Sequence, residues 1–435
     1  MDMPEAIELN DVERLIRPGY RVFVQAGVGE PRDIIAALAG PADGASDHCD
    51  ATVDYLTVSI PGINSALAPR NLHRGAHLHT TFLHPGLGEG DTHRPVSFIP
   101  MHYRDTYRFL QTGDRFDVGV IQVSPPDDDG LCSLGISVDF VPAILDSCDI
   151  VIAELNPQLP APPDSLKIPL STIHYRVDVD HPLPCSHIAE PGETELAIAA
   201  NVAGLIDDDS CIQIGIGKLP GGILKALSGH RRLGLHSGLI SDAAQQLIES
   251  GVITGESKSI DRGSHVTGLA WGSVAFYDWL RDRPDIAFRP VDYTHDLRTL
   301  SAIDQFVSIN SVVEIDLQGQ ANAEVVNGQQ VSATGGLVDF TRGARASHGG
   351  KSILALPATA MRGTRSRIVS QLSSRIVTLC RADVDYVVTE YGCASLFGQS
   401  IQSRAQSLVD IAAPAFRDQL WQDWENAQSK RVQAE

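Results

Sequence analysis

Short apolar runs rich in β-branched residues alternate with helical stretches along the whole chain, and this rhythm is the strongest constraint on the fold. Such alternation is typical of α/β proteins, in which helices cover a mostly parallel sheet. The expected strands are Arg21–Gly27, Val53–Ile60, Asp117–Ser124, Ile150–Asn156, Cys211–Gly217, Leu233–Ser237, Val312–Leu317, Ile353–Leu356, Arg375–Cys380 and Tyr386–Glu390. The expected helices are Pro31–Leu38, Glu193–Ile206, Gly221–Leu227, Asp242–Ser250 and Gln402–Ile411.

The length of the chain predicts two domains. A chain of 435 residues exceeds what one ordinary hydrophobic core organises, and 43% hydrophobic with 20% charged residues is usual for a globular protein. The turn-rich segment Asp178–Gly192 contains Pro182, Pro184 and Pro191, which favours a linker. We therefore expect an N-terminal domain of residues 1–185 and a C-terminal domain of residues 186–435.

The formal charge of the chain is −20, which argues against nucleic acid as the main partner. Any polyanionic ligand must therefore be bound by local donors. No apolar run reaches membrane-spanning length and the N-terminus lacks a signal-peptide pattern, so we expect neither a membrane span nor secretion. Seven scattered cysteines without a Cys-x-x-Cys pair fit the reduced thiols of a cytoplasmic protein.

A glycine-rich turn between an expected strand and an expected helix is the first candidate binding element. Residues Cys211–Leu227 read CIQIGIGKLPGGILKAL. Such a turn exposes backbone N–H groups and the positive end of the helix dipole, which suit a phosphate or the developing oxyanion of a thioester. A tight turn without a ligand is the simpler interpretation of this spacing.

The cations of this acidic chain gather near glycine-bearing segments. Three of the six lysines, Lys218, Lys225 and Lys351, lie in or beside the segments 214–219 and 333–351. Five arginines lie in or after the second segment: Arg342, Arg345, Arg362, Arg365 and Arg367. Guanidinium and ammonium groups beside exposed backbone favour phosphate binding, with a solvated basic patch as the alternative.

Taken in order, the motifs of the chain resemble the acetyl-CoA hydrolase/transferase family, which includes 4-hydroxybutyrate CoA-transferase-like enzymes. The resemblance covers nearly the whole length. In the first half it rests on RPGYRVFVQAGVGEP (17–31), SPPDDDGLCSLGISVD (124–139) and IVIAELNPQLP (150–160). In the second half it rests on IQIGIGKLP (212–220), LGLHSGLISD (233–242), INSVVEIDLQGQANAE (309–324), GGLVDFTRGA (335–344) and VTEYGCASLFGQS (388–400).

This resemblance implies two open α/β domains of the CoA-transferase type, with the active site in the cleft between them. It further implies acyl-CoA and a carboxylate acceptor as substrates, no permanently bound cofactor, and a homodimer or tetramer. The positions that it assigns to coenzyme A and its thioester are Gln213, Gly215, Ile216, Gly217, Lys218, Leu219, Asn310, Gly335, Gly336 and Lys351.

Gly238 departs from the family pattern. The resemblance places here, within LGLHSGLISD, the glutamate that attacks the acyl-CoA and then carries coenzyme A as a glutamyl thioester. Glycine cannot do this, and the flanking match needs no gap. The neighbours Ser237 and His236 point to opposite faces of a strand, so at most one of them faces the site. The sequence therefore leaves the catalytic residue open.

Other candidate nucleophiles are weaker. Glu390, Glu324 and Glu256 are carboxylates in matching or neighbouring segments, and a structural role is the favoured interpretation for the first two. Cys211 and Cys393 are interpreted as small buried hydrophobic residues rather than nucleophiles.

Four histidines lie within twelve residues: His73, His77, His79 and His84. A His-x-His pair on a strand presents both rings to one face, as a zinc site requires, yet no acidic or cysteine partner stands at a clear ligand spacing. We therefore expect no metal and interpret the segment as a wall of the substrate pocket. The arginines that could receive a carboxylate there are Arg74, Arg94 and Arg104.

Three functions follow from this reading. The first expectation is coenzyme A transfer between a short or medium acyl-CoA and a carboxylate, which needs a carboxylate from elsewhere in place of Gly238. Hydrolysis, or acyl transfer to another acceptor, needs only an oxyanion hole and a positioned water or acceptor. The third is a catalytically silent acyl-CoA binding protein or inactive subunit.

Overall fold

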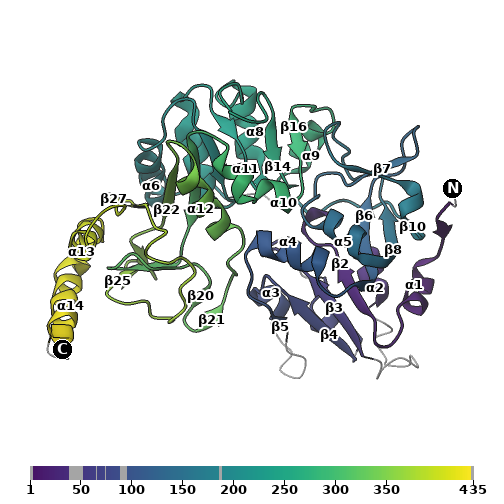
Figure 1. Cartoon of the computed structure of the whole chain (residues 1–435), viewed down its shortest axis with the longest axis horizontal. Coiled ribbons are helices and arrows are strands. Elements are labelled where there is room, and N and C mark those ends of the chain that lie inside the picture. The colour runs from purple at the N-terminus through teal and green to yellow at the C-terminus, as the bar shows by residue number, and fades with distance from the viewer. Residues whose placement is uncertain are drawn as a thin grey trace. The chain divides into compact units, whose positions relative to one another are not determined.

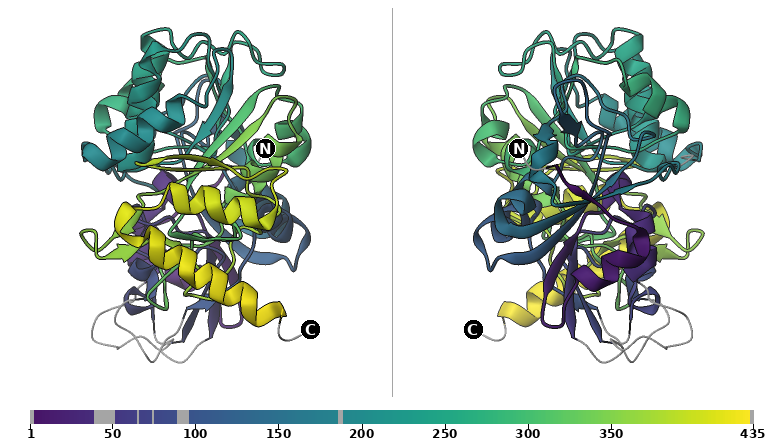
Figure 2. Two further views of the ribbon diagram at one scale, coloured as in Figure 1. Left: turned by 90° about the vertical axis from the view of Figure 1, so that its left-hand side faces the viewer. Right: turned by 90° about the vertical axis from the view of Figure 1, so that its right-hand side faces the viewer.

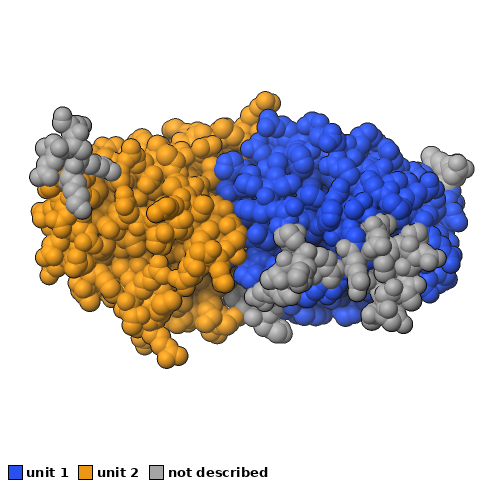
Figure 3. Space-filling view, turned by 90° about the horizontal axis from the view of Figure 1, so that it is seen from below, with its two compact units in different colours: residues 1–187, 266–294, 331–335 blue, residues 188–265, 295–330, 336–435 orange. Residues whose placement is uncertain are grey.

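The computed structural model describes residues 3–38, 52–64, 66–73, 75–88, 96–185 and 189–432. The chain forms two compact units, whose residues are coloured separately in Figure 3. Unit 1 comprises Met1–His187, Val266–Thr294 and Val331–Gly335. Unit 2 comprises Ile188–His265, His295–Gln330 and Gly336–Glu435. The expected boundary at 185/186 lies close to the end of the first segment, but the sequence did not predict that two later segments belong to unit 1.

Unit 1 is built on a parallel sheet of eight described strands, with the order β1-β10-β8-β6-β2-β3-β4-β5 (Figure 1). The strands are β1 (Glu5–Ala6), β2 (Arg21–Val24), β3 (Val53–Thr57), β4 (Ala76–Thr80), β5 (Ser97–Phe98), β6 (Phe116–Val123), β8 (Cys148–Leu155) and β10 (Tyr175–Asp178). β6 and β8 are buried along almost their whole length, as strands covered on both faces must be. A short antiparallel pair, β7 (Leu131–Ser133) and β9 (Lys167–Pro169), adjoins them in sequence.

Helices cover the sheet of unit 1. Their apolar residues recur on one face, which is the face that a helix packed on a sheet buries. α1 and α2 contribute Val12, Ile34, Ile35 and Leu38 to the core that also holds Tyr55. α5 packs on β6 and β8 and against α4. The helices of this part are α1 (Leu9–Leu15), α2 (Arg32–Leu38), α3 (Pro85–Gly88), α4 (Tyr103–Thr112) and α5 (Val141–Ser147).

The segment 266–294 joins unit 1 through backbone hydrogen bonds. Val138 N–H donates to the Gly268 carbonyl at 3.0 Å, and Val291 N–H donates to the Asp139 carbonyl at 3.0 Å. Arg289 adds a bidentate pair with Asp164, at 2.8 and 3.0 Å. The elements of this segment are β14 (His265–Thr267), β15 (Leu269–Ala270), α9 (Val274–Leu280), β16 (Ile286–Phe288) and α10 (Val291–Thr294).

Unit 2 contains a second sheet of six described strands, with the order β12-β11-β17-β22-β26-β27. The strands pair in parallel except for the hairpin of β26 with β27. Their bounds are β11 (Cys211–Ile214), β12 (Gly234–Leu235), β17 (Phe306–Ser311), β22 (Lys351–Ala355), β26 (Tyr386–Thr389) and β27 (Gly392–Ser395). The class expected from the sequence, an open α/β fold, is confirmed in both units.

Two helix pairs flank the sheet of unit 2. α6 packs with α7 and contacts β22, β26 and β27, while α12 packs with α11 and contacts β17 and β22. α13 and α14 lie side by side next to β27 (Figure 2). The helices are α6 (Glu193–Ala203), α7 (Lys218–Ala226), α8 (Asp242–Glu249), α11 (Leu297–Ser301), α12 (Leu337–Ala346), α13 (Ile401–Asp410) and α14 (Pro414–Val432). No described helix has both the length and the apolarity of a membrane span.

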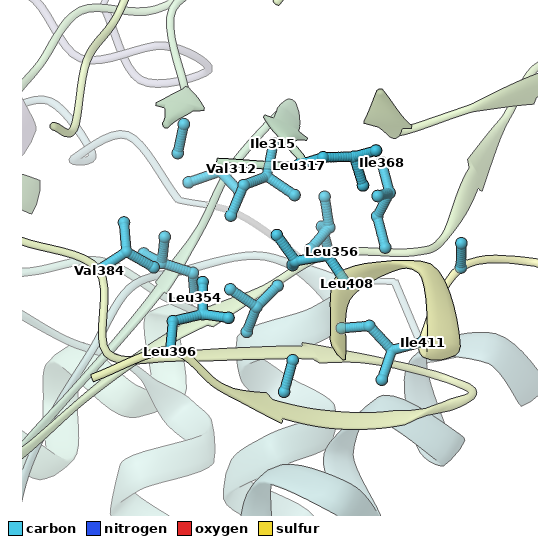
Figure 4. Packing of buried hydrophobic residues seen from close by; sticks show 14 of the residues in the cluster. Val312, Ile315, Leu317, Leu354, Leu356, Ile368, Val384, Leu396, Leu408 and Ile411 are labelled. Carbon is cyan, nitrogen blue, oxygen red and sulfur yellow. The ribbon is translucent and has the colours of Figure 1, made fainter. Parts of the chain in front are cut away.

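Short strands and hairpins extend unit 2 beyond its main sheet. The short strands at 314–316, 321–322 and 368–369 share one hydrophobic core with β22, β26 and α13, in which Ile315, Leu354, Ile368 and Leu408 meet (Figure 4). The strands are β13 (Leu239–Ile240), β18 (Glu314–Asp316), β19 (Ala321–Asn322), β20 (Val325–Val326), β21 (Gln329–Gln330), β23 (Thr359–Ala360), β24 (Arg365–Ser366) and β25 (Ile368–Val369).

The strand expected at Arg375–Cys380 is wrong. Arg375 has a φ of 59°, and Ile376 and Val377 stay 41% and 46% exposed, so this apolar run joins no sheet. Only Leu379 makes an isolated bridge, to Ala321. Conversely, the sequence missed β17 because its polar residues interrupt the apolar run.

Leu354 offers a test of the core of unit 2. Its side chain is fully buried in β22, so Leu354→Ala should lower the free energy of unfolding by about 2–5 kcal/mol through lost burial and the cavity left behind. Urea unfolding followed by circular dichroism measures this. Leu297→Ala, on a side chain that is 50% exposed, is the matched control and should have little effect. Equal effects of the two substitutions would contradict the placement of Leu354 in the core.

Candidate functional site

The sheet of unit 2 has a topological switch point between β11 and β17. From β11 the chain adds β12 on one side, and it then returns to add β17, β22 and β26 on the other. Ligands of open α/β sheets bind where the parallel strands end, beside such a switch point. We call this side of the sheet the carboxyl edge, and the candidate site of unit 2 lies there.

The glycine turn stands at the carboxyl edge between β11 and α7. Gly217 has a φ of 117°, which few residues other than glycine adopt, and α7 begins at the next residue, Lys218. A Cβ built on Gly215 would meet no described atom within 4 Å, so the backbone there is open to approach. Ile216 is half-buried and Leu219 is buried behind the turn. The turn therefore presents backbone N–H groups and a helix N-terminus to an anion or an oxyanion.

A reciprocal amide pair spans the switch point. Asn310 Nδ2 donates to Gln213 Oε1 at 3.0 Å, and Gln213 Nε2 lies 3.4 Å from Asn310 Oδ1. Gln213 is buried, whereas Asn310 is half-buried at the end of β17. Both residues were expected to contact coenzyme A, and the structure brings them together beside the glycine turn.

Gly238 follows β12 at the same edge, and its two neighbours are engaged elsewhere. Ser237 Oγ donates to the Ile214 carbonyl at 3.0 Å, and this side chain is fully buried. His236 is also fully buried, with its ring edge-on to Phe306. Ser237 thus ties the end of β12 to the end of β11, which is a structural role.

The space beside Gly238 is filled by the ring of His295. A Cβ built on Gly238 would lie 2.8 Å from His295 Cε1, and one built on Gly336 would lie 2.5 Å from His295 Nε2. The ring also packs on Phe340, with 4.3 Å between the centroids. Burial lowers the pKa of His295 to about 3, so this imidazole is neutral at neutral pH. Two glycines from distant segments therefore make room for one neutral imidazole, which the sequence did not reveal.

Of the remaining expected residues, Lys351 lies away from this arrangement, whereas Gly335 directly precedes Gly336 in the chain. Lys351 begins β22, at the opposite edge of the sheet, where its Nζ donates to Asp207 Oδ2 at 2.7 Å and to the Leu205 carbonyl at 2.8 Å. Its contact with coenzyme A stays a prediction, and in this structure its ammonium group is engaged with Asp207 and the Leu205 carbonyl. Gly335 belongs to unit 1, where its carbonyl accepts from Tyr103 N–H at 3.1 Å.

The other carboxylates and thiols divide between structural and exposed positions. Glu390 follows β26 and accepts from Ala358 N–H at 2.8 Å. Glu324 is buried and accepts from Thr378 Oγ1 at 2.8 Å, whereas Glu256 is exposed. Cys211 is buried as expected, but Cys393 is exposed because it lies on the edge strand β27.

Unit 1 holds a cavity at the carboxyl ends of β2 and β3, of about 320 Å³ with its open mouth included. β2 adjoins the switch point of that sheet, since β3 lies on one side of it and β6 on the other. Apolar side chains, among them Phe23, Val58 and Ile60, line most of the wall. The sequence did not predict this cavity.

Asp139 is the carboxylic acid on the wall of this cavity. Its backbone has a φ of 22°, a region that side-chain-bearing residues seldom adopt. Burial raises the pKa of its carboxyl to about 7. A strained residue with a poised carboxyl in a mostly apolar cavity is a candidate functional residue. Asp139 is the last residue of the family-like segment 124–139, and this position could have indicated a functional role from the sequence.

Three histidines of the histidine-rich segment lie within hydrogen-bonding or ion-pairing distance of other side chains of unit 1. His77 and His79 each lie 3.4 Å from Asp54, while His84 Nε2 lies 2.9 Å from Ser59 Oγ. Arg74 and Arg94 fall outside the described residues. Arg104 lies half-buried on α4, within unit 1.

These features define the class of protein: an open α/β protein with a glycine turn and a helix N-terminus at a topological switch point. The chain belongs to the acetyl-CoA hydrolase/transferase family, whose N-terminal domain matches residues 4–185 and whose C-terminal domain matches residues 272–424. It is therefore an enzyme of the CoA-transferase and acetyl-CoA hydrolase class.

Relatives and solved structures agree with this assignment. The chain is 36% identical to 4-hydroxybutyrate coenzyme A transferase of Clostridium kluyveri over 93% of both proteins. It is 37% identical to butyryl-CoA:acetate CoA-transferase of Anaerostipes caccae over 76% of this chain and 75% of the relative. The crystal structure of RipA from Yersinia pestis matches with a TM-score of 0.90 and 31% identity over 98% of both chains.

The packing of His295 predicts strong coupling between two positions. Gly238→Glu should destabilise the protein by about 1–3 kcal/mol, because its Cβ overlaps the imidazole ring. Combining it with His295→Ala should remove most of that penalty, so a double-mutant cycle by urea unfolding should give a non-zero coupling energy. His295→Ala alone supplies the reference for the cavity. Additive effects would show that the ring does not occupy the space of a side chain at position 238.

Asp139 predicts a pH dependence of stability with a defined sign. The folded carboxyl keeps its proton up to about pH 7, whereas the unfolded one releases it near pH 4. Between these values the folded state holds more protons, so the free energy of unfolding falls as pH rises. Asp139→Asn should remove this contribution and gain stability relative to wild type from pH 5 to pH 7.5. Asp128→Asn, on an exposed side chain, should show no such trend; identical trends would contradict the prediction.

Proposed function

We propose that this protein transfers coenzyme A between a short or medium acyl-CoA and a carboxylic acid. The carboxyl edge of unit 2 supports this, because the glycine turn offers backbone donors for the thioester oxygen and Asn310 adds an amide beside it. The names of the relatives, which include transferases acting on 4-hydroxybutyrate and on butyryl-CoA, support a small acid as substrate. The homodimer or tetramer implied by the sequence stays a prediction, tested by light scattering.

The observation that carries the mechanism is the ring of His295 against Gly238. The atoms nearest to a Cβ at position 238 belong to His295 and Phe340, and the imidazole ring leaves no room there for a carboxylate of the described residues. We therefore infer that the acceptor acid supplies the nucleophile itself. Both substrates must then be bound together before coenzyme A moves.

The proposed transfer needs no covalent enzyme-bound intermediate. A carboxylate oxygen of the acceptor attacks the thioester carbon, the C–S bond breaks, and coenzyme A leaves as a thiolate. The mixed anhydride of the two acids remains. The thiolate then attacks the acceptor's carbonyl carbon, the anhydride C–O bond breaks, and the donor acid leaves as a carboxylate. The glycine turn would stabilise the oxyanion formed in each attack.

The cavity of unit 1 is proposed to hold the hydrocarbon part of an acid. Its mostly apolar wall suits a hydrocarbon chain. Asp139, protonated below about pH 7, would donate a hydrogen bond to a polar group of that acid.

Steady-state kinetics test the mechanism. With butyryl-CoA and acetate varied together, initial-rate plots should intersect, because both substrates bind before a product leaves. Borohydride reduction after incubation with butyryl-CoA alone should leave every glutamate unmodified. Parallel plots together with a reduced glutamate would overturn direct attack and identify the residue that carries coenzyme A. Gly238→Glu with His295→Ala is the positive control, since it restores both a carboxylate and the space around it.

Hydrolysis is the second candidate, and the same filled position favours it, because water needs no enzyme carboxylate. Release of coenzyme A from acyl-CoA alone, at a rate that added carboxylates do not change, would establish hydrolysis in place of transfer. Absence of turnover across a panel of acyl-CoA thioesters would establish the third alternative, a silent binding protein.

A further inference from the structure

A second cavity lies in unit 2 between the hairpin of β20 with β21 and the hairpin of β23 with β24. Its volume is about 510 Å³ with the open mouth included. Arg365 and Arg367 both line it, and we call it the arginine pocket. The cavity therefore contains two of the five arginines that lie in or after the second glycine-bearing segment. Arg342 and Arg345 of the same set are engaged elsewhere, with Asp383 and with the ring of Phe397.

The two guanidinium groups share the cavity because their residues are two apart on extended chain. Side chains at such positions project to the same face, while Ile368 projects into the hydrophobic core. Arg365 is held in place: its Nη1 donates to Asn327 Oδ1 at 2.7 Å and its Nη2 donates to Ser373 Oγ at 3.1 Å. A fixed guanidinium loses little conformational freedom on binding a ligand.

Arg367 has unused hydrogen-bonding capacity. Its Nε is buried and has no hydrogen-bond partner among the described residues. Burial lowers the pKa of its guanidinium, and the negative charge of Glu390 acts in the opposite direction. A buried guanidinium without full hydrogen bonding is costly, and an anion in the cavity would remove that cost.

The acid on the cavity wall does not satisfy these cations. Glu314 already accepts from Ser373 N–H at 3.1 Å, from Ser373 Oγ at 3.0 Å and from Asn322 Nδ2 at 3.3 Å. Arg365 Nη2 stays 3.9 Å from Glu314 Oε2. Glu314 is the one carboxylate among the described residues that line the cavity, and its oxygens are already hydrogen-bonded, so it does not occupy the donors of the two guanidinium groups.

The remaining wall is apolar and unusually exposed. Val326 and Met361 are 36% and 60% exposed beside the arginines. Met361 and Arg362 also have φ values of 51° and 55°, so the tip of the β23–β24 hairpin holds two successive residues in a conformation that favours glycine. A ligand for this cavity therefore combines an anionic group with a flat or apolar body.

We propose that the arginine pocket binds a phosphate monoester with an aromatic or apolar body. Several phosphate oxygens can accept from both guanidinium forks at once, whereas a carboxylate engages one fork. Two sources carry this chemistry: the 3′-phosphorylated adenosine end of coenzyme A, or a separate phosphorylated metabolite. Only the assignment to coenzyme A rests on the proposed function.

Calorimetry with adenosine 3′,5′-bisphosphate tests the site without any turnover. Binding to the full-length protein should weaken by about tenfold or more in Arg367→Gln and in Arg365→Gln. Arg367→Lys keeps the charge but loses the fork, so it should bind between the two. Arg342→Gln, on an exposed arginine outside the pocket, is the matched control and should bind as wild type. Thermal melting verifies that each variant is folded.

Absence of bisphosphate binding, or an equal loss in Arg342→Gln, would overturn the site, as would tighter binding of butyrate than of the bisphosphate. Coenzyme A and dephospho-coenzyme A then separate the two sources. If Arg367→Gln weakens binding of coenzyme A but not of the dephospho form, the pocket holds the 3′-phosphate of the substrate. If it weakens only the bisphosphate, the site stands and the assignment to coenzyme A fails. Bisphosphate binding by a protein that turns over no acyl-CoA would leave the site intact and reject the proposed function alone.

Discussion

The parallel pairing of β17 with β11 is the constraint on which the candidate site of unit 2 depends. Its register sets Gln213 opposite Ser308, so Asn310, two residues further along, lies on the same face as Gln213 and reaches its amide. A slip of one residue would turn Asn310 to the other face. The same pairing brings the ends of β11, β12 and β17 to one edge, where the glycine turn and Gly238 lie. Backbone hydrogen bonds between strands thus determine which side chains share the site.

The packing of His295 gives Gly238 a structural role that the sequence did not predict. In the sequence this glycine marks a missing nucleophile. In the structure it is also a packing requirement, because an imidazole ring lies against its Cα and against that of Gly336. The glycine turn is present, and the proposed chemistry is therefore attack on a thioester by a group that the enzyme does not supply.

The sequence predicted the α/β class, the positions of β2, β3, β6, β8, β11 and β26, and the glycine turn, because each depends on local patterns of apolar residues and glycines. It missed β17, whose Ser308, Asn310 and Ser311 break the apolar pattern although the first of them is fully buried. It failed at Arg375–Cys380, where apolar residues are exposed in an irregular segment. The local pattern of apolar residues indicates which segments can form strands. Pairing with a neighbouring strand decides whether a given segment becomes one.

The sequence by itself determined the family, the fold class and the absence of a carboxylate at position 238, since these need only residue identities in order. The tertiary structure decided what occupies the vacated position, because His295 and Gly336 are distant in sequence and meet Gly238 only after folding. It also decided that Lys351 lies at the opposite edge of the sheet, and that Arg365 and Arg367, among five clustered arginines, share one cavity. The physical reason is common to all three: strand direction and side-chain face, not spacing along the chain, determine which groups come within contact distance.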